Sequence, residues 1–207
     1  MTKNISMADT LLDKVYKKLG LTNDKEKLSS IYEIIDELNK IHIIDGINGT
    51  TTGKITERLV EVQLRIFAED TYFNIKVNSD KWVGDFGLIG IPFNTIISVK
   101  SYTAKERLIT SGSGSALCPT IGYGHFKDIK GFSSIDRLLS YKIRGFISIH
   151  IPKSTYSLLE KKLKDFKNIN DKPFIRQIQN FGEDLSNAME VRVIGKESQK
   201  IINPRKL

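Results

Sequence analysis

Apolar residues recur at helical spacing through the first third of the chain. Residues 7–19 carry one apolar stripe, and a second stripe runs through residues 24–41. Together they predict a helical pair in an N-terminal subdomain of residues 1–45. Such stripes are usually buried, which favours core packing or dimer contact over chemistry. A third helix is predicted over residues 54–68.

Beyond residue 70 the apolar runs become short and alternate with helical patterns. The predicted strands cover residues 71–77, 145–152 and 189–195, together with a hairpin over residues 82–102. The predicted helices cover residues 104–109, 133–142, 153–166 and 173–181. This alternation predicts an α/β fold: a central mixed sheet of four to five strands flanked by helices. One domain of residues 1–207 would then hold an α/β core of residues 50–195 and a loose basic tail of residues 196–207.

The hairpin carries the most informative polar residues. Gly and Pro mark its turn, and a four-residue loop pairs Ile89 with Asn94. Counting back along antiparallel strands places Asp85 opposite Ser98, and alternation puts Lys100 on the same face. A carboxylate with an ammonium beside it on a rigid strand pair can hold a hard divalent cation and orient a water. An ordinary half-exposed hairpin with a surface Asp and Lys is the alternative interpretation.

Asp85, twelve further residues and then Ser98-Val99-Lys100 form a motif that resembles the PD-(D/E)XK nuclease superfamily, and within it the type II restriction endonucleases. The motif departs from the family pattern at Gly84, where Pro is usual, and at Ser98, where Asp or Glu is usual. A Ser hydroxyl is a much poorer magnesium ligand than a carboxylate. Several restriction enzymes of this superfamily also carry Ser-Val-Lys and receive the missing carboxylate from elsewhere in the fold.

The resemblance implies a division of roles around Mg²⁺. Asp85 would bind the metal, with Glu57 and the Val99 carbonyl completing the ligand set. Lys100 would orient the attacking water and stabilise the pentavalent phosphate, and Ser98 would be a weak or water-mediated ligand. Hydrolysis of a phosphodiester needs both a metal that neutralises developing charge and a lysine near the nucleophile.

Three glutamates are candidates for the displaced carboxylate. Glu57 stands four residues after Gly53, which resembles the first helix of PD-(D/E)XK folds. Glu61 lies one helical turn later on the same face, and Glu106 follows the hairpin. The alternative for the helix glutamates is a surface ion pair with a neighbouring arginine, such as Arg58.

Charge is unevenly spread along the chain. The net charge is +8; residues 1–99 hold 12 Lys/Arg against 14 Asp/Glu, whereas residues 100–207 hold 20 against 10. A basic half attracts phosphate backbones, although surface lysine can also serve only for solubility. Residues 103–127, which are rich in Gly and Ser, are interpreted as a DNA-recognition insertion or a plain surface loop. The candidate DNA contacts are Lys105, Arg107, Ser113, Tyr123 and His125.

Several classes of function are disfavoured. No apolar run reaches membrane-spanning length, the N-terminus is too polar for a signal peptide, and a lone Cys118 predicts no disulfide, so we expect a cytoplasmic protein. The three histidines lack zinc-ligand spacing.

The sequence therefore predicts a magnesium-dependent, sequence-specific endonuclease of double-stranded DNA, a type II restriction enzyme. A palindromic site would imply a homodimer, and a cognate DNA methyltransferase is expected only as a functional companion. Two alternatives stay open: a structure-selective repair or junction-resolving nuclease, and a non-catalytic DNA-binding protein on a degenerate nuclease fold.

Overall fold

The computed structural model describes residues 6–45, 47–67, 74–76, 85–88, 95–101, 108, 112, 119–194 and 197–202. Its N-terminal part contains the helices α1 (Met7–Leu19), α2 (Asp24–Ser29), α3 (Ile31–Asp45) and α4 (Gly49–Phe67). The predicted single helix over residues 24–41 is wrong in one respect, because the chain leaves helical geometry at Ser30 (φ −100°, ψ 23°). The Ser30 carbonyl then accepts the N–H of Ile34, so the same residue ends α2 and begins the hydrogen bonding of α3.

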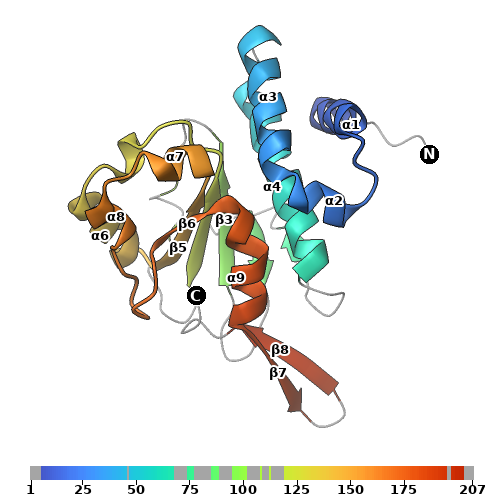
Figure 1. Ribbon diagram of the computed structural model, residues 1–207. Helices are drawn as coiled ribbons and strands as arrows, with labels where there is room; N and C mark the ends of the chain where they lie inside the picture. The colour runs from blue at the N-terminus through green and yellow to red at the C-terminus, as the bar shows by residue number, and fades with distance from the viewer. Residues whose placement is uncertain are drawn as a thin grey trace.

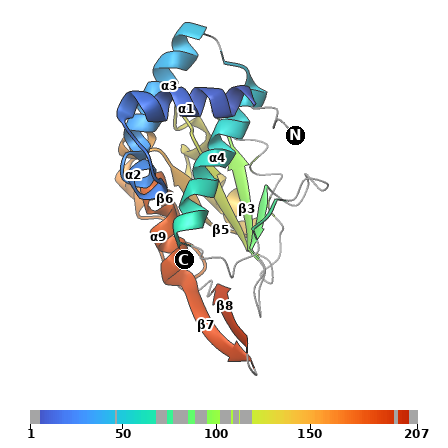
Figure 2. The same cartoon turned by 90° about the vertical axis from the view of Figure 1, so that its right-hand side faces the viewer.

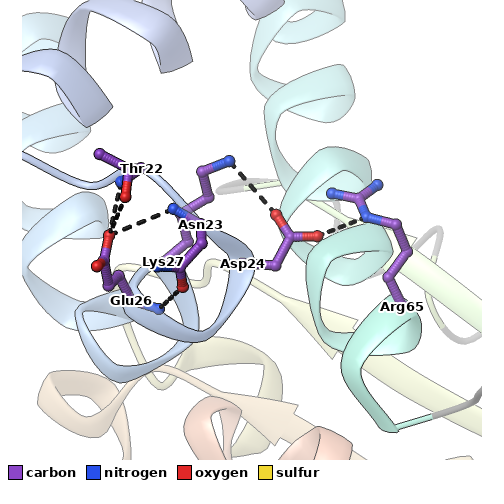
Figure 3. A network of polar contacts seen from close by, with 6 residues as sticks. All are labelled: Thr22, Asn23, Asp24, Glu26, Lys27 and Arg65. Atoms are coloured by element: carbon purple, nitrogen blue, oxygen red, sulfur yellow. Dashed lines mark hydrogen bonds and ion pairs between the residues drawn. The ribbon is translucent and has the colours of Figure 1, made fainter.

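Polar contacts fix the short helix α2 against α4 (Figure 3). Asn23 and Glu26 form a capping box, which satisfies exposed N–H groups at the start of α2. Asp24 accepts from Arg65 of α4 at 2.7 Å and from Lys27 at 3.3 Å. The hydrogen bond from Arg65 is the largest influence that holds the pKa of Asp24 below its ordinary value. A helix of six residues is marginal alone, so these contacts and its neighbours determine its position.

A mixed sheet forms the centre of the domain. Its order is β1 (Asn74–Lys76), β2 (Phe86–Leu88), β3 (Thr95–Lys100), β4 (Thr120–Gly124), β5 (Phe146–Ile151) and β6 (Ile175–Gln177). The pairs β1–β2 and β2–β3 are antiparallel, and the remaining pairs are parallel. The predicted fold class is confirmed, although the described sheet has six strands where four to five were expected. β4 and β6 were not predicted as strands, and the predicted strand over residues 189–195 lies in a separate two-stranded sheet.

Helices cover both faces of this sheet (Figures 1 and 2). One face lies under α4 and α9 (Phe181–Ala188), and α1 and α3 extend the same apolar core. The other face lies under α6 (Ile135–Ile143), α7 (Lys153–Ser157) and α8 (Lys161–Lys164), with the 3-10 turn η1 (Lys130–Phe132). The side chains of β3 and β4 are therefore sorted between two buried layers, and this sorting positions the candidate site.

The C-terminal part differs from the prediction in three places. Residues 153–166 form two short helices, because Leu159 is buried between them and Glu160 is extended. Residues 173–181, predicted as a helix, contain β6 and the 3-10 turn η2 (Ile178–Asn180), since Ile175 pairs with Ile149 of β5. The tail is not loose up to residue 202: β8 (Glu197–Ile202) pairs antiparallel with β7 (Met189–Ile194), and the hairpin projects from the body in Figures 1 and 2.

Candidate active site

The β2–β3 hairpin has the register that the sequence predicts. Its paired residues are Phe86 with Ile97, Gly87 with Ile96, and Leu88 with Thr95. Asp85 directly precedes β2, and its N–H donates to the Ile97 carbonyl at 2.9 Å, one residue out of step with the β2–β3 pairing. The position of Asp85 opposite Ser98 therefore stays a prediction. The predicted turn residues lie outside the described part of the chain. The hairpin brings Asp85 to the end of β3 that carries Lys100.

The two faces of the hairpin have opposite surroundings. Phe86, Ile97 and Val99 are buried in the apolar core beneath α4. Because side chains alternate along a strand, Asp85, Ser98 and Lys100 would be expected on the other face. Ser98 is fully buried, whereas the side chains of Asp85 and Lys100 are 29% and 16% exposed. The apolar face fixes the hairpin, and the polar face carries the motif.

Asp85, Val99 and Lys100 converge at the end of this polar face. Oδ2 of Asp85 accepts the N–H of Val99 at 2.6 Å and the ammonium of Lys100 at 3.1 Å. The same ammonium donates to the Val99 carbonyl at 3.0 Å. One cationic group is therefore held by a carboxylate oxygen and a backbone carbonyl oxygen. Hard divalent cations prefer this combination of oxygen donors, so the donor chemistry of these two atoms suits such a cation.

Two glycines of β4 lie next to Ser98 and Lys100 in the sheet. Gly122 pairs with Ser98, and Gly124 pairs with Lys100. A Cβ at Gly124 would stand 2.4 Å from the ring of Phe126 and 2.8 Å from the Lys100 carbonyl, so no larger residue fits without a shift. Close packing within the sheet therefore requires glycine at position 124, whereas a Cβ at Gly122 would lie 3.2 Å from the Ile149 side chain and need only a small shift. The sequence interpretation of residues 120–124 as part of a surface insertion is wrong, because they form a central strand.

The helix glutamates have different surroundings. Glu61 accepts from Arg58 at 2.7 Å, and Arg58 also donates to Asp9 of α1 at 2.9 Å. Glu61 thus forms an ion pair with a neighbouring arginine, which was the alternative to metal binding in the sequence analysis. Glu57 lies half-buried on α4, the helix that packs on the Ile97 and Val99 face. Its place in a ligand set stays a prediction.

A wider carboxylate or histidine cluster does not accompany the motif in the described residues. Among those residues, no three His, Cys, Asp or Glu side chains gather as a metal site. Glu106, the third candidate, lies outside them, as do Lys105, Arg107 and Ser113 among the candidate DNA contacts. The observed donor set is therefore one carboxylate and one carbonyl.

Tyr123 and His125 lie in the interior, contrary to the expectation that they contact DNA. They are 0% and 2% exposed. The Tyr123 hydroxyl accepts from Nε2 of Gln63 at 2.9 Å, and Nδ1 of His125 lies 3.4 Å from the hydroxyl of Thr56. Burial lowers the pKa of His125 to about 3, so the ring is neutral. Both side chains connect β4 to α4, and neither can reach a nucleic acid in this fold.

A second polar cluster was not predicted from the sequence. Nε2 of His150 on β5 lies 2.9 Å from the carboxylate of Asp184 on α9, which also accepts from Arg176 at 2.7 Å. Burial raises the pKa of Asp184, but the contacts with His150 and Arg176 outweigh it and hold that pKa below its ordinary value. The three residues are distant in sequence and form no motif, so no sequence signal pointed to them. The cluster attaches α9 to the sheet.

Comparisons with known proteins support the fold. No protein-family model matches the chain, and no curated protein matches it significantly. Among solved structures, the complex of restriction endonuclease PspGI with substrate DNA is similar, with a TM-score of 0.51 and 11% sequence identity over 88% of this chain and 93% of that one. The chain therefore has a restriction-endonuclease-like fold. In the described residues, no helix is both long and apolar enough to span a bilayer.

Proposed function

We propose that this protein is a magnesium-dependent endonuclease of double-stranded DNA, of the type II restriction class. The observation that carries the proposal is the convergence of the Asp85 carboxylate and the Val99 carbonyl on the Lys100 ammonium. The resemblance of the motif to the PD-(D/E)XK superfamily and the similarity of the fold to a restriction endonuclease support it independently.

Each residue of the motif has a task in this reaction. Asp85 and the Val99 carbonyl would hold Mg²⁺, and a glutamate would add a second carboxylate. When bound, the metal supplies positive charge beside the scissile phosphate. Lys100 orients the attacking water and stabilises negative charge that develops on the phosphate. The buried Ser98 would contribute through a water at most, because its hydroxyl is a weak ligand.

DNA as substrate is supported by charge. Residues 119–180, which include the layer α6–α8, hold 12 Lys/Arg against 5 Asp/Glu, whereas residues 6–67 hold 9 against 10. Residues 119–180 are thus the more basic of the two segments, and positive charge favours association with phosphates. The similar solved structure is itself a complex with substrate DNA. A homodimer would read a palindromic site most simply, and a methyltransferase companion would belong to the same restriction function.

A non-catalytic DNA-binding protein is the second candidate. It is favoured by the buried hydroxyl of Ser98 at the position where the family places a carboxylate. In that case the Asp85–Lys100 pair would only stabilise the hairpin. The two candidates differ in one observable property, which is cleavage.

Incubation of the purified protein with Mg²⁺ and a long, varied DNA tests the proposal. Discrete fragments on a gel are expected, and they should disappear with EDTA and in the Asp85→Asn variant. A preference for branched over linear duplex would indicate the structure-selective alternative. DNA binding without any magnesium-stimulated cutting would favour the non-catalytic one.

The second carboxylate is assigned by single substitutions. Glu57→Gln is expected to abolish cleavage and retain DNA binding. Glu61→Gln should cleave normally, because its carboxylate already pairs with Arg58. Loss of cleavage in Glu106→Gln, with normal rates in Glu57→Gln, would transfer the role to Glu106.

A further inference from the structure

We infer that the Lys100 ammonium and the divalent cation compete for the same two oxygens, so that metal binding displaces the lysine side chain. The inference rests on the proposed function and adds a role for Lys100 before catalysis begins. In this role Lys100 weakens metal binding, although the same residue assists the chemistry.

Geometry makes the competition direct. The ammonium lies 3.1 Å from Oδ2 of Asp85 and 3.0 Å from the Val99 carbonyl oxygen. A magnesium or manganese ion held by both oxygens would need the position beside them that the ammonium occupies. An ammonium in contact with the same oxygens would stand against that ion, and two positive charges this close repel strongly. Occupancy by one cation excludes the other.

Asp85 is poorly able to serve both cations through Oδ2. That oxygen also accepts the Val99 N–H at 2.6 Å, which fixes the carboxylate against β3. A carboxylate oxygen offers about two lone-pair sites, and the amide and the ammonium already use them. A metal ion on Oδ2 therefore replaces the ammonium.

The displaced side chain stays tethered to the end of β3 and next to the metal ligands. Its ammonium can then contact a water or a phosphate oxygen at the metal. The site thus has two arrangements: in one the Lys100 ammonium contacts the two oxygens, and in the other the metal does and the lysine side chain is displaced. Removal of the ammonium favours the metal-bound arrangement.

Metal affinity in the absence of DNA separates this role from catalysis. Mn²⁺ suits the same oxygen ligands, and electron paramagnetic resonance measures the unbound ion during a titration. Lys100→Met keeps the aliphatic stem and removes the ammonium, and we expect it to bind Mn²⁺ roughly fivefold more tightly than the wild type, since a partly exposed ion pair is lost to the metal. Lys100→Arg, which keeps a cation, should bind no more tightly than the wild type.

A charge-matched control removes the same positive charge at a distance. Lys161 is exposed on α8, so Lys161→Met should bind Mn²⁺ with wild-type affinity. Circular dichroism verifies that each variant is folded. Wild-type or weaker affinity in folded Lys100→Met would overturn the competition, even if the wild-type enzyme cleaves DNA with Mg²⁺. Failure of the wild type and of Lys100→Met to bind Mn²⁺ would overturn both the competition and the metal-dependent function, whereas failure to cleave alone would affect only the latter.

Discussion

Asp85→Asn separates the structural role of the carboxylate from its proposed chemical role. The substitution keeps the shape of the side chain and removes its charge. The pair with Lys100 is partly exposed, at 29% and 16% for the two side chains, so its loss costs at most about 1 kcal/mol. A weaker hydrogen bond from the Val99 N–H adds about 1 kcal/mol. The free energy of unfolding should therefore fall by only about 1–2 kcal/mol, which is roughly 5 °C in Tm for a chain of this size.

Cleavage should respond far more strongly. Without the carboxylate the metal loses the charged ligand that lies beside Val99 and Lys100, and the rate constant should fall on the order of a thousandfold. Linearisation of supercoiled plasmid in Mg²⁺ measures the rate, thermal unfolding by circular dichroism measures stability, and fluorescence anisotropy at fixed salt measures DNA affinity. Asp165→Asn, at an exposed aspartate after α8, makes the same charge change as a control. Cleavage by folded Asp85→Asn within about tenfold of the wild-type rate would refute the reasoning, since removal of a group that stabilises transition-state charge costs about a hundredfold or more.

Buried polar side chains and the uneven charge support three further tests. Tyr123→Phe leaves Nε2 of Gln63 without its acceptor, so the free energy of unfolding should fall by about 1–3 kcal/mol with DNA affinity unchanged; the opposite pattern would return Tyr123 to the DNA interface. Below pH 6.5 the unfolded chain protonates His125, while the folded chain keeps it neutral down to about pH 3. The free energy of unfolding therefore decreases as the pH is lowered from 6.5 to about 3. In urea titrations His125→Gln should reduce that slope by up to about 1.4 kcal/mol per pH unit, and equal slopes would contradict the buried neutral ring. DNA affinity should fall steeply with salt, with a slope of log affinity against log salt of about −3 or steeper, whereas a flat response would remove the basic residues from binding.

The hairpin could be predicted because its information is local. Gly and Pro mark the turn, alternation marks the faces, and the register then places Asp85 opposite Ser98. The structure has the predicted register from Phe86 to Leu88, and Asp85, which precedes this strand, contacts Lys100. Prediction succeeded where neighbours in sequence determine neighbours in space.

Errors arose where distant segments decide the structure. The glycines of residues 120–124 suggested a loop, yet they are there because Phe126 and the neighbouring strands approach closely. Ile175 joins the sheet because β5 offers it a parallel edge, which local helix propensity does not reveal. His150, Arg176 and Asp184 meet only in the folded chain.

The most direct test of the account is the position of Mn²⁺ in a crystal of the protein, located by anomalous scattering. We expect a peak about 2.0–2.3 Å from a carboxylate oxygen of Asp85 and from the Val99 carbonyl oxygen, with the Lys100 ammonium moved off both. A peak bound elsewhere, with Lys100 still on both oxygens, would contradict the proposal that these residues form a metal-dependent active site.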